Sequence, residues 1–187
     1  MENGQGCYKV VKLSYSIPGK IWWIHNFLDH EVYKGIHDAI IKERKKINLH
    51  TSKGLWGEYL ISNIEPPMRV EVTNYPPFEK LKTLVRHNAY FQLNDVEKMS
   101  TIIHYMKKDA GINWHNDGAW KYGATYNVNH KWHGQWGGEF MFTDGNGHGW
   151  IPPVGNSLVI IKSPLNHKVN PVLSPIMPRI SVQIFMK

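Results

Sequence analysis

The sequence predicts a mainly β fold: a double-stranded β-helix, or jelly-roll barrel, with helices packed on its outside. From Phe91 onward, short segments rich in β-branched and aromatic residues alternate with Gly, Pro, Asn and Asp, which is typical of antiparallel strands. Before that point, two stretches repeat apolar residues with a helical period. The 187 residues suit one domain, with a helical part at about 20–90 and a jelly-roll core at about 91–187.

The first expected helix follows Asp29, a residue type that caps helix N-termini. Its apolar positions recur every four residues, at Val32, Ile36 and Ile40. Lys42 to Lys46 fall at its end, where the helix dipole favours cations. We therefore interpret this basic run as structural.

The second expected helix opens at Pro76-Pro77, because proline is favoured in the first helical turn. It ends near Asn88, and one of its faces is apolar. Between the two helices, Leu55 to Tyr75 is apolar in patches and contains Pro66-Pro67, which predicts a strand and a loop.

Six strands are expected in the second half of the chain. Each is short, and turn-forming residues separate it from the next. They lie near 99–106, 122–129, 138–142, 157–162, 167–172 and 179–186.

Composition excludes several classes of protein. With 42% hydrophobic and 12% aromatic residues, the chain is globular and not a disordered tail. No apolar stretch approaches the length of a membrane span, and a single cysteine, Cys7, excludes an internal disulfide. These features predict a cytoplasmic protein. The net charge of +7 favours an acidic partner but does not identify one.

A His-x-Asp triplet and a distant histidine are the main chemical signal. His115 and Asp117 are two residues apart at the end of an extended segment, so their side chains share a face. With His167 from another strand, they form the two-histidine, one-carboxylate set that binds non-haem Fe(II) and leaves positions open. The three residues are therefore both the expected metal ligands and the expected catalytic centre.

Arg179 follows the last ligand on the next expected strand. A guanidinium group can hold a carboxylate in two parallel hydrogen bonds, which predicts a dicarboxylate co-substrate. Ser181 lies on the same face of that strand and can add a hydrogen bond.

At this point the chain resembles the 2-oxoglutarate and Fe(II)-dependent oxygenases, in particular the prolyl 4-hydroxylase-like branch. The similarity runs from about Asn26 to Phe185. Besides the triad and Arg179, the matching pieces are Tyr105 at the spacing of the family's pocket tyrosine, Tyr126 to Trp132, Gly137-Gly138-Glu139-Phe140, Pro153-Val154-Gly155 with Ser157, and His167 to Val172.

The resemblance implies Fe(II), 2-oxoglutarate and O2 as reactants, with ascorbate as a reductant of oxidised iron. It implies hydroxylation of an unactivated C–H bond with release of succinate and CO2. Tyr126 and Tyr105 would then donate hydrogen bonds to the co-substrate. For both tyrosines, a packing role in the core is the alternative.

Other histidines and tryptophans carry weaker signals. His130 and His133 lie in a strand and loop, so their spacing does not predict zinc. His104 would face away from Tyr105 on the same strand, as a core or surface residue. Packing is the first interpretation for Trp114, Trp120, Trp132, Trp136 and Trp150.

Three classes of function stay open at this stage. A peptidyl hydroxylase is the first, with proline in a protein or peptide as the first candidate substrate. The second is the same chemistry on a small molecule or nucleic acid, although Arg179 is the last arginine and the Arg-rich motif of nucleic-acid dealkylases is missing. The third is a barrel that binds metal and dicarboxylate without catalysis.

Overall fold

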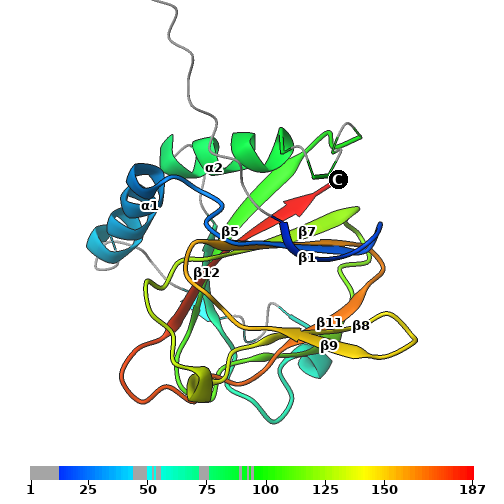
Figure 1. Ribbon diagram of the computed structural model, residues 1–187. Helices are drawn as coiled ribbons and strands as arrows, with labels where there is room; N and C mark the ends of the chain where they lie inside the picture. The colour runs from blue at the N-terminus through cyan, green and yellow to red at the C-terminus, as the bar shows by residue number, and fades with distance from the viewer. Residues whose placement is uncertain are drawn as a thin grey trace, which may run out of the picture.

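Two antiparallel β-sheets face each other in the computed structural model, and both helices lie against the outer face of the larger sheet (Figure 1). The structure describes residues 13–43, 50–51, 53, 56–71, 76–88, 90–91, 93 and 95–187. Cys7 and most of the basic run after the first helix lie outside these residues.

Within the described residues, the larger sheet has eight strands. Their order across the sheet is β1 (Leu13–Ile17), β2 (Ile21–Ile24), β10 (Ser157–Lys162), β7 (Tyr122–Asn127), β12 (Arg179–Met186), β5 (Met99–Met106), β4 (Met68–Glu71) and β3 (His50–Thr51). The smaller sheet has four strands, in the order β6 (Ile112–His115), β11 (Asn166–Val169), β8 (Phe140–Thr143) and β9 (His148–Ile151). Neighbours far apart in sequence, such as β12 and β5, confirm the jelly-roll prediction.

The helices α1 (His30–Glu43) and α2 (Pro76–Arg86) bury one face each. Ile36 and Ile40 of α1 and Leu81 of α2 join a core with the outer face of the larger sheet. A second core lies between the sheets. Two short 3-10 helices, η1 (Glu58–Leu60) and η2 (Gly134–Trp136), lie in loops.

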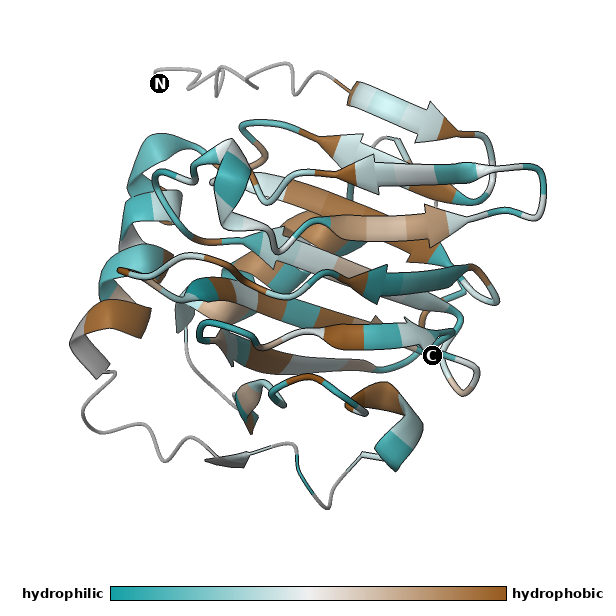
Figure 2. Ribbon diagram, turned by 90° about the horizontal axis from the view of Figure 1, so that it is seen from below, coloured by the Kyte–Doolittle hydropathy of each residue, from teal (hydrophilic) through white to brown (hydrophobic). Residues whose placement is uncertain are grey.

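Strand alternation divides the larger sheet into two chemically different faces. On β12, Ile180, Val182 and Ile184 face the helices and belong to the first core. Their neighbours Arg179 and Ser181 must face the space between the sheets, because side chains alternate along a strand. The same alternation is visible in Figure 2, where hydrophobic and polar positions follow one another along the strands. The inner face of β12 thus carries the polar residues Arg179 and Ser181, whereas Val159 and Ile161 of β10 contribute apolar side chains to the second core.

Both expected helices and all six expected strands are present, with bounds shifted by a few residues. The hairpin β1–β2 and the strands β3 and β9 were not predicted. The part at about 20–90 is accordingly not only helical, because β2 and β4 complete the larger sheet. Among the described residues, no helix is long and apolar enough to cross a membrane.

Candidate active site

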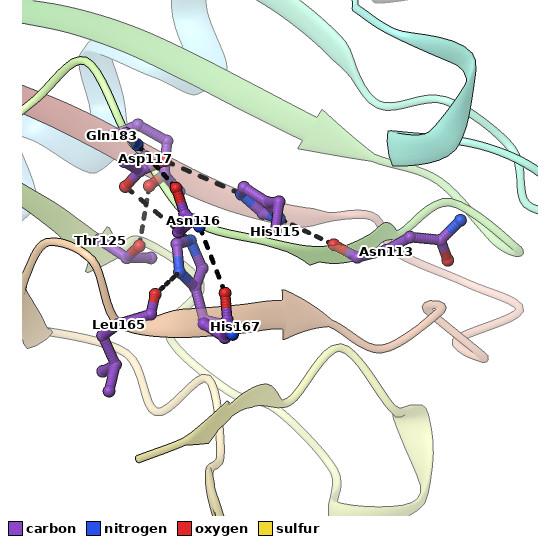
Figure 3. Close-up of polar contacts among 10 residues, drawn as sticks. Asn113, His115, Asn116, Asp117, Thr125, Leu165, His167 and Gln183 are labelled. Atoms are coloured by element: carbon purple, nitrogen blue, oxygen red, sulfur yellow. Dashed lines mark hydrogen bonds and ion pairs between the residues drawn. The ribbon is translucent and has the colours of Figure 1, made fainter. Parts of the chain in front are cut away.

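The predicted metal ligands converge between the two sheets (Figure 3). His115 ends β6 and His167 lies opposite it on β11, where the two are paired in register. Asp117 follows two residues after His115. Asp117 Oδ1 lies 3.8 Å from His115 Nε2, and Asp117 Oδ2 lies 3.9 Å from His167 Nε2. One potential ligand atom from each of the three residues lies within 4.8 Å of the other two.

Backbone carbonyls orient both imidazoles. His115 Nδ1 lies 2.7 Å from the carbonyl of Asn113, and His167 Nδ1 lies 3.0 Å from that of Leu165 (Figure 3). A carbonyl only accepts, so each Nδ1 carries the proton and each Nε2 presents a lone pair. The ring of Phe140 stacks on His167 at 5.2 Å. Both histidines are therefore held in the tautomer that binds metal through Nε2.

The charges at this centre fit a divalent cation. Burial, and to a smaller extent the neighbouring His115, lower the pKa of His167 to about 3, so this imidazole is neutral at physiological pH. Burial raises the pKa of Asp117, and His115 opposes this shift. A largely buried carboxylate beside two imidazoles is stabilised by a cation, and two nitrogens and one oxygen suit Fe(II).

A cavity of about 640 Å³ opens beside the three ligands. Strands of both sheets line it, and Trp56, Tyr59 and Leu60 from the η1 segment form one wall. Asn113 fastens this segment: its side-chain amide donates to the carbonyls of Tyr59 and Ser62. The same strand, β6, thus positions a metal ligand and a wall of the cavity.

Arg179 is a buried cation that forms no ion pair with a carboxylate among the described residues, although the charge of Glu139 acts on it from a longer distance. Its side chain is 1% exposed. The guanidinium donates to Ser181 Oγ at 3.2 Å and to Asn127 Oδ1 at 3.1 Å, both neutral groups, and its Nε has no acceptor among the described residues. Burial lowers its pKa to about 10, so it stays charged at neutral pH. A buried guanidinium with unused donors is suited to bind an anion.

Polar residues connect Arg179 with the cavity beside the metal ligands. Gln183 lines the cavity and donates to Ser181 Oγ at 3.1 Å, and Thr125 donates to the Gln183 side-chain carbonyl at 2.8 Å. Strand registers explain the cluster, since Ser181 and Gln183 pair with Asn127 and Thr125 of β7. Asn127, Gln183 and Thr125 were not predicted from the sequence.

His104 was expected to be a core or surface histidine, but it faces the cavity. It is cross-strand partner to Ser181 on one side and to Arg69 on the other, so all three share the inner face. Its ring is 2% exposed, and neither nitrogen has a hydrogen-bond partner among the described residues. Burial, and then the charges of Arg179, Arg69 and His115, lower its pKa to about 3.

Tyr126 and Tyr105 do not lie in the site, which corrects the prediction made for them. Tyr126 pairs in register with Val182, and Tyr105 with Ile180, so both face the helices and belong to the outer core. The hydroxyl of Tyr126 donates to Asn156 Oδ1 at 3.0 Å. Alternation places their neighbours Asn127 and His104 on the cavity side instead.

Comparison with known families decides the identity of this arrangement. The sequence model of the 2OG-Fe(II) oxygenase superfamily matches residues 78–187, which is more than half of the chain. The chain belongs to this superfamily. Membership implies Fe(II), 2-oxoglutarate and O2, and the His115, Asp117 and His167 cluster is where the metal would bind. No curated protein matches the chain.

Solved structures share the oxygenase fold at low sequence identity. A Pseudomonas putida prolyl-4-hydroxylase has a TM-score of 0.69 at 13% identity, covering 90% of this chain and 92% of that one. A prolyl hydroxylase from Trichoplax adhaerens, in complex with a hypoxia-inducible-factor peptide fragment, has 0.75 at 13%, covering 90% and 84%. A viral collagen prolyl hydroxylase from Paramecium bursaria Chlorella virus-1 has 0.65 at 14%, covering 90% and 96%.

Proposed function

We propose that this oxygenase hydroxylates an unactivated C–H bond in a peptide or protein, with proline as the first candidate. The observation that carries the co-substrate assignment is Arg179, a buried charge whose hydrogen-bond partners among the described residues are all neutral, on the sheet that faces the metal ligands. The peptide assignment is supported by the prolyl hydroxylases among its structural neighbours.

Each part of the site has a separate task. Bound Fe(II) would supply O2 activation coupled to oxidation of 2-oxoglutarate to succinate and CO2. His115, Asp117 and His167 hold the metal, and the carbonyls of Asn113 and Leu165 keep the imidazoles aligned. The inner face of β12 receives the distal carboxylate of the co-substrate.

Arg179 and Ser181 bind that carboxylate, and we add His104 to them. Its neutral ring is adjacent to Ser181 in register and has unused hydrogen-bonding capacity. A bound carboxylate would accept a hydrogen bond from this imidazole. It would also compensate the charge of Arg179 in a place from which the protein excludes water.

Calorimetry on the Mn(II)-loaded protein tests the co-substrate site without turnover. Arg179→Ala should weaken 2-oxoglutarate binding about 100-fold or more, because one partner of a buried charge pair is lost. Mn(II) affinity should change little. Lysine at this position should rescue only part of the loss, because a point charge does not reproduce the planar fork. Lys162→Ala, which removes an exposed cation from β10, is the control.

Turnover tests the reaction itself. The Fe(II)-loaded protein, supplied with 2-oxoglutarate and a pool of proline-containing peptides, should form succinate only with O2 and add one oxygen atom to a peptide. Mass spectrometry reads both products. Binding of metal and 2-oxoglutarate without succinate from any pool would instead identify a binding module. Full activity in His167→Ala would contradict the metal assignment.

A further inference from the structure

A second cation, Arg69, faces the cavity at a distance from Arg179. Arg69 lies on β4 and lines the cavity together with Glu71, two residues further along the same strand. Besides the metal ligand Asp117, these two are the formally charged residues among those described along the cavity wall. The charge preference of the substrate pocket therefore depends on this short strand.

The two charges differ in how well water can solvate them. Glu71 is exposed, so its carboxylate is hydrated at the rim. Arg69 is half-buried, and no ion pair or hydrogen bond joins it to another described residue. A guanidinium has five N–H donors and no acceptor, so a half-buried one without partners has donors to offer. An anionic group entering the cavity would satisfy them.

The co-substrate does not need Arg69. Its distal carboxylate has Arg179, and its other end belongs at the metal ligands on the opposite sheet. Since adjacent strands are about 4.8 Å apart, β4 lies roughly 10 Å from β12, with β5 between them. Arg69 is thus free to bind a different molecule than the one held by Arg179.

We propose that Arg69 selects a substrate with an acidic side chain close to the residue that is hydroxylated. This inference rests on the proposed peptide hydroxylase function and specifies its substrate class. A carboxylate can accept two parallel hydrogen bonds from the guanidinium. Trp56 and Tyr59, on the wall fastened by Asn113, provide apolar surface for the flanking peptide. The net charge of +7 draws an acidic peptide toward the protein.

Synthetic proline peptides provide the probe. Each set has Asp, Asn or Lys at one position near the proline and is otherwise identical. The wild-type protein should oxidise the Asp member with a kcat/KM about 10- to 100-fold above that of the Lys member, at one position or more. Arg69→Ala should remove this preference, and Arg69→Glu should reverse it in favour of Lys.

Reversal of the preference cannot come from misfolding, which would lower the oxidation of every peptide. Glu71→Gln is the matched control: it removes the neighbouring charge, and the preference for Asp should persist. The 2-oxoglutarate affinity of the Mn(II)-loaded variants should equal that of the wild type. Oxidation of all peptides without regard to charge, or an unchanged preference in Arg69→Glu, would overturn the Arg69 proposal alone. If the wild type oxidises no peptide at all, the peptide function is overturned, and this inference with it.

Discussion

Gly123 is packed against the carboxylate of Asp117: a Cβ atom at position 123 would lie 2.5 Å from Asp117 Oδ2. Gly123 belongs to β7 of the larger sheet, whereas Asp117 follows β6 of the smaller one. The missing side chain therefore lets the metal-binding carboxylate approach the opposite sheet. At this position, glycine is required by a close contact and not by the backbone conformation.

Gly123→Ala should accordingly displace Asp117 and weaken Mn(II) binding by about 10- to 100-fold, as other changes next to metal ligands do. Calorimetry of the metal-free protein measures the affinity. Gly35→Ala is the control, because a Cβ there meets nothing within 4 Å on helix α1. That control should keep the metal affinity and gain up to about 1 kcal/mol of helix stability. Equal metal affinity in both variants would show that Asp117 is not a ligand or can move freely.

His104→Phe and Tyr105→Phe separate the two faces of β5. Replacement of His104 removes a donor next to Ser181 and should weaken 2-oxoglutarate binding to the Mn(II)-loaded protein about tenfold. Tyr105→Phe changes only the outer core, so its 2-oxoglutarate affinity should match that of the wild type. If Tyr105→Phe weakened 2-oxoglutarate binding and His104→Phe did not, Tyr105 would be the co-substrate ligand, as the sequence predicted.

That comparison shows what sequence can determine at this site. His115 and Asp117 are two residues apart at the end of β6, and the chemistry of the ligand set and of the guanidinium group, supported by the family resemblance, points to His167 and Arg179. The face on which Tyr105 or His104 lies depends instead on how β5 pairs with β12, where Ser181 meets His104. A shift of one residue in strand pairing exchanges the two faces. The local sequence does not encode that register.

The strand β2 was missed for a related reason. The pairing of β2 with β10 joins segments from the two ends of the chain, and β2 contains two tryptophans in a run without clear alternation. Arg69 could not be recognised as a cavity residue either, because its place depends on β4 pairing with His104 of β5. Segment type was predictable from periodicity, whereas the neighbours of each segment were not.

The buried His104 also predicts a pH dependence of stability. Its pKa is about 3 in the folded protein and about 6.5 in the unfolded chain. Between these values the unfolded state binds more protons, so stability falls as the pH falls below about 6.5. The loss from this residue is about 2 kcal/mol at pH 5.

Urea unfolding of the metal-free protein at pH 7 and pH 5 measures this effect. The wild type should lose about 2 kcal/mol more than His104→Phe over that interval, because the variant lacks the titrating group. His167 and Asp117 titrate in both proteins, so their effects cancel in the difference. The same loss in both proteins would mean that His104 is accessible to protons in the folded state.

Asn127→Asp should change protein stability and co-substrate binding in opposite directions. Asn127 Oδ1 accepts a hydrogen bond of 3.1 Å from Arg179, and both side chains are buried. An aspartate at this position would give Arg179 the carboxylate partner that it lacks, and the cost of burying the cation is already included in the wild-type fold. The folded protein should therefore gain stability against urea at pH 7.

The added negative charge of Asn127→Asp would also occupy the guanidinium and repel an incoming dicarboxylate. This should weaken 2-oxoglutarate binding by at least about tenfold, while Mn(II) affinity stays close to that of the wild type. Asn127→Leu removes both the acceptor for Arg179 and the donor to Ser157 Oγ without adding a charge, and it should be less stable than the wild type. Tighter 2-oxoglutarate binding in Asn127→Asp would show that the co-substrate does not bind at Arg179.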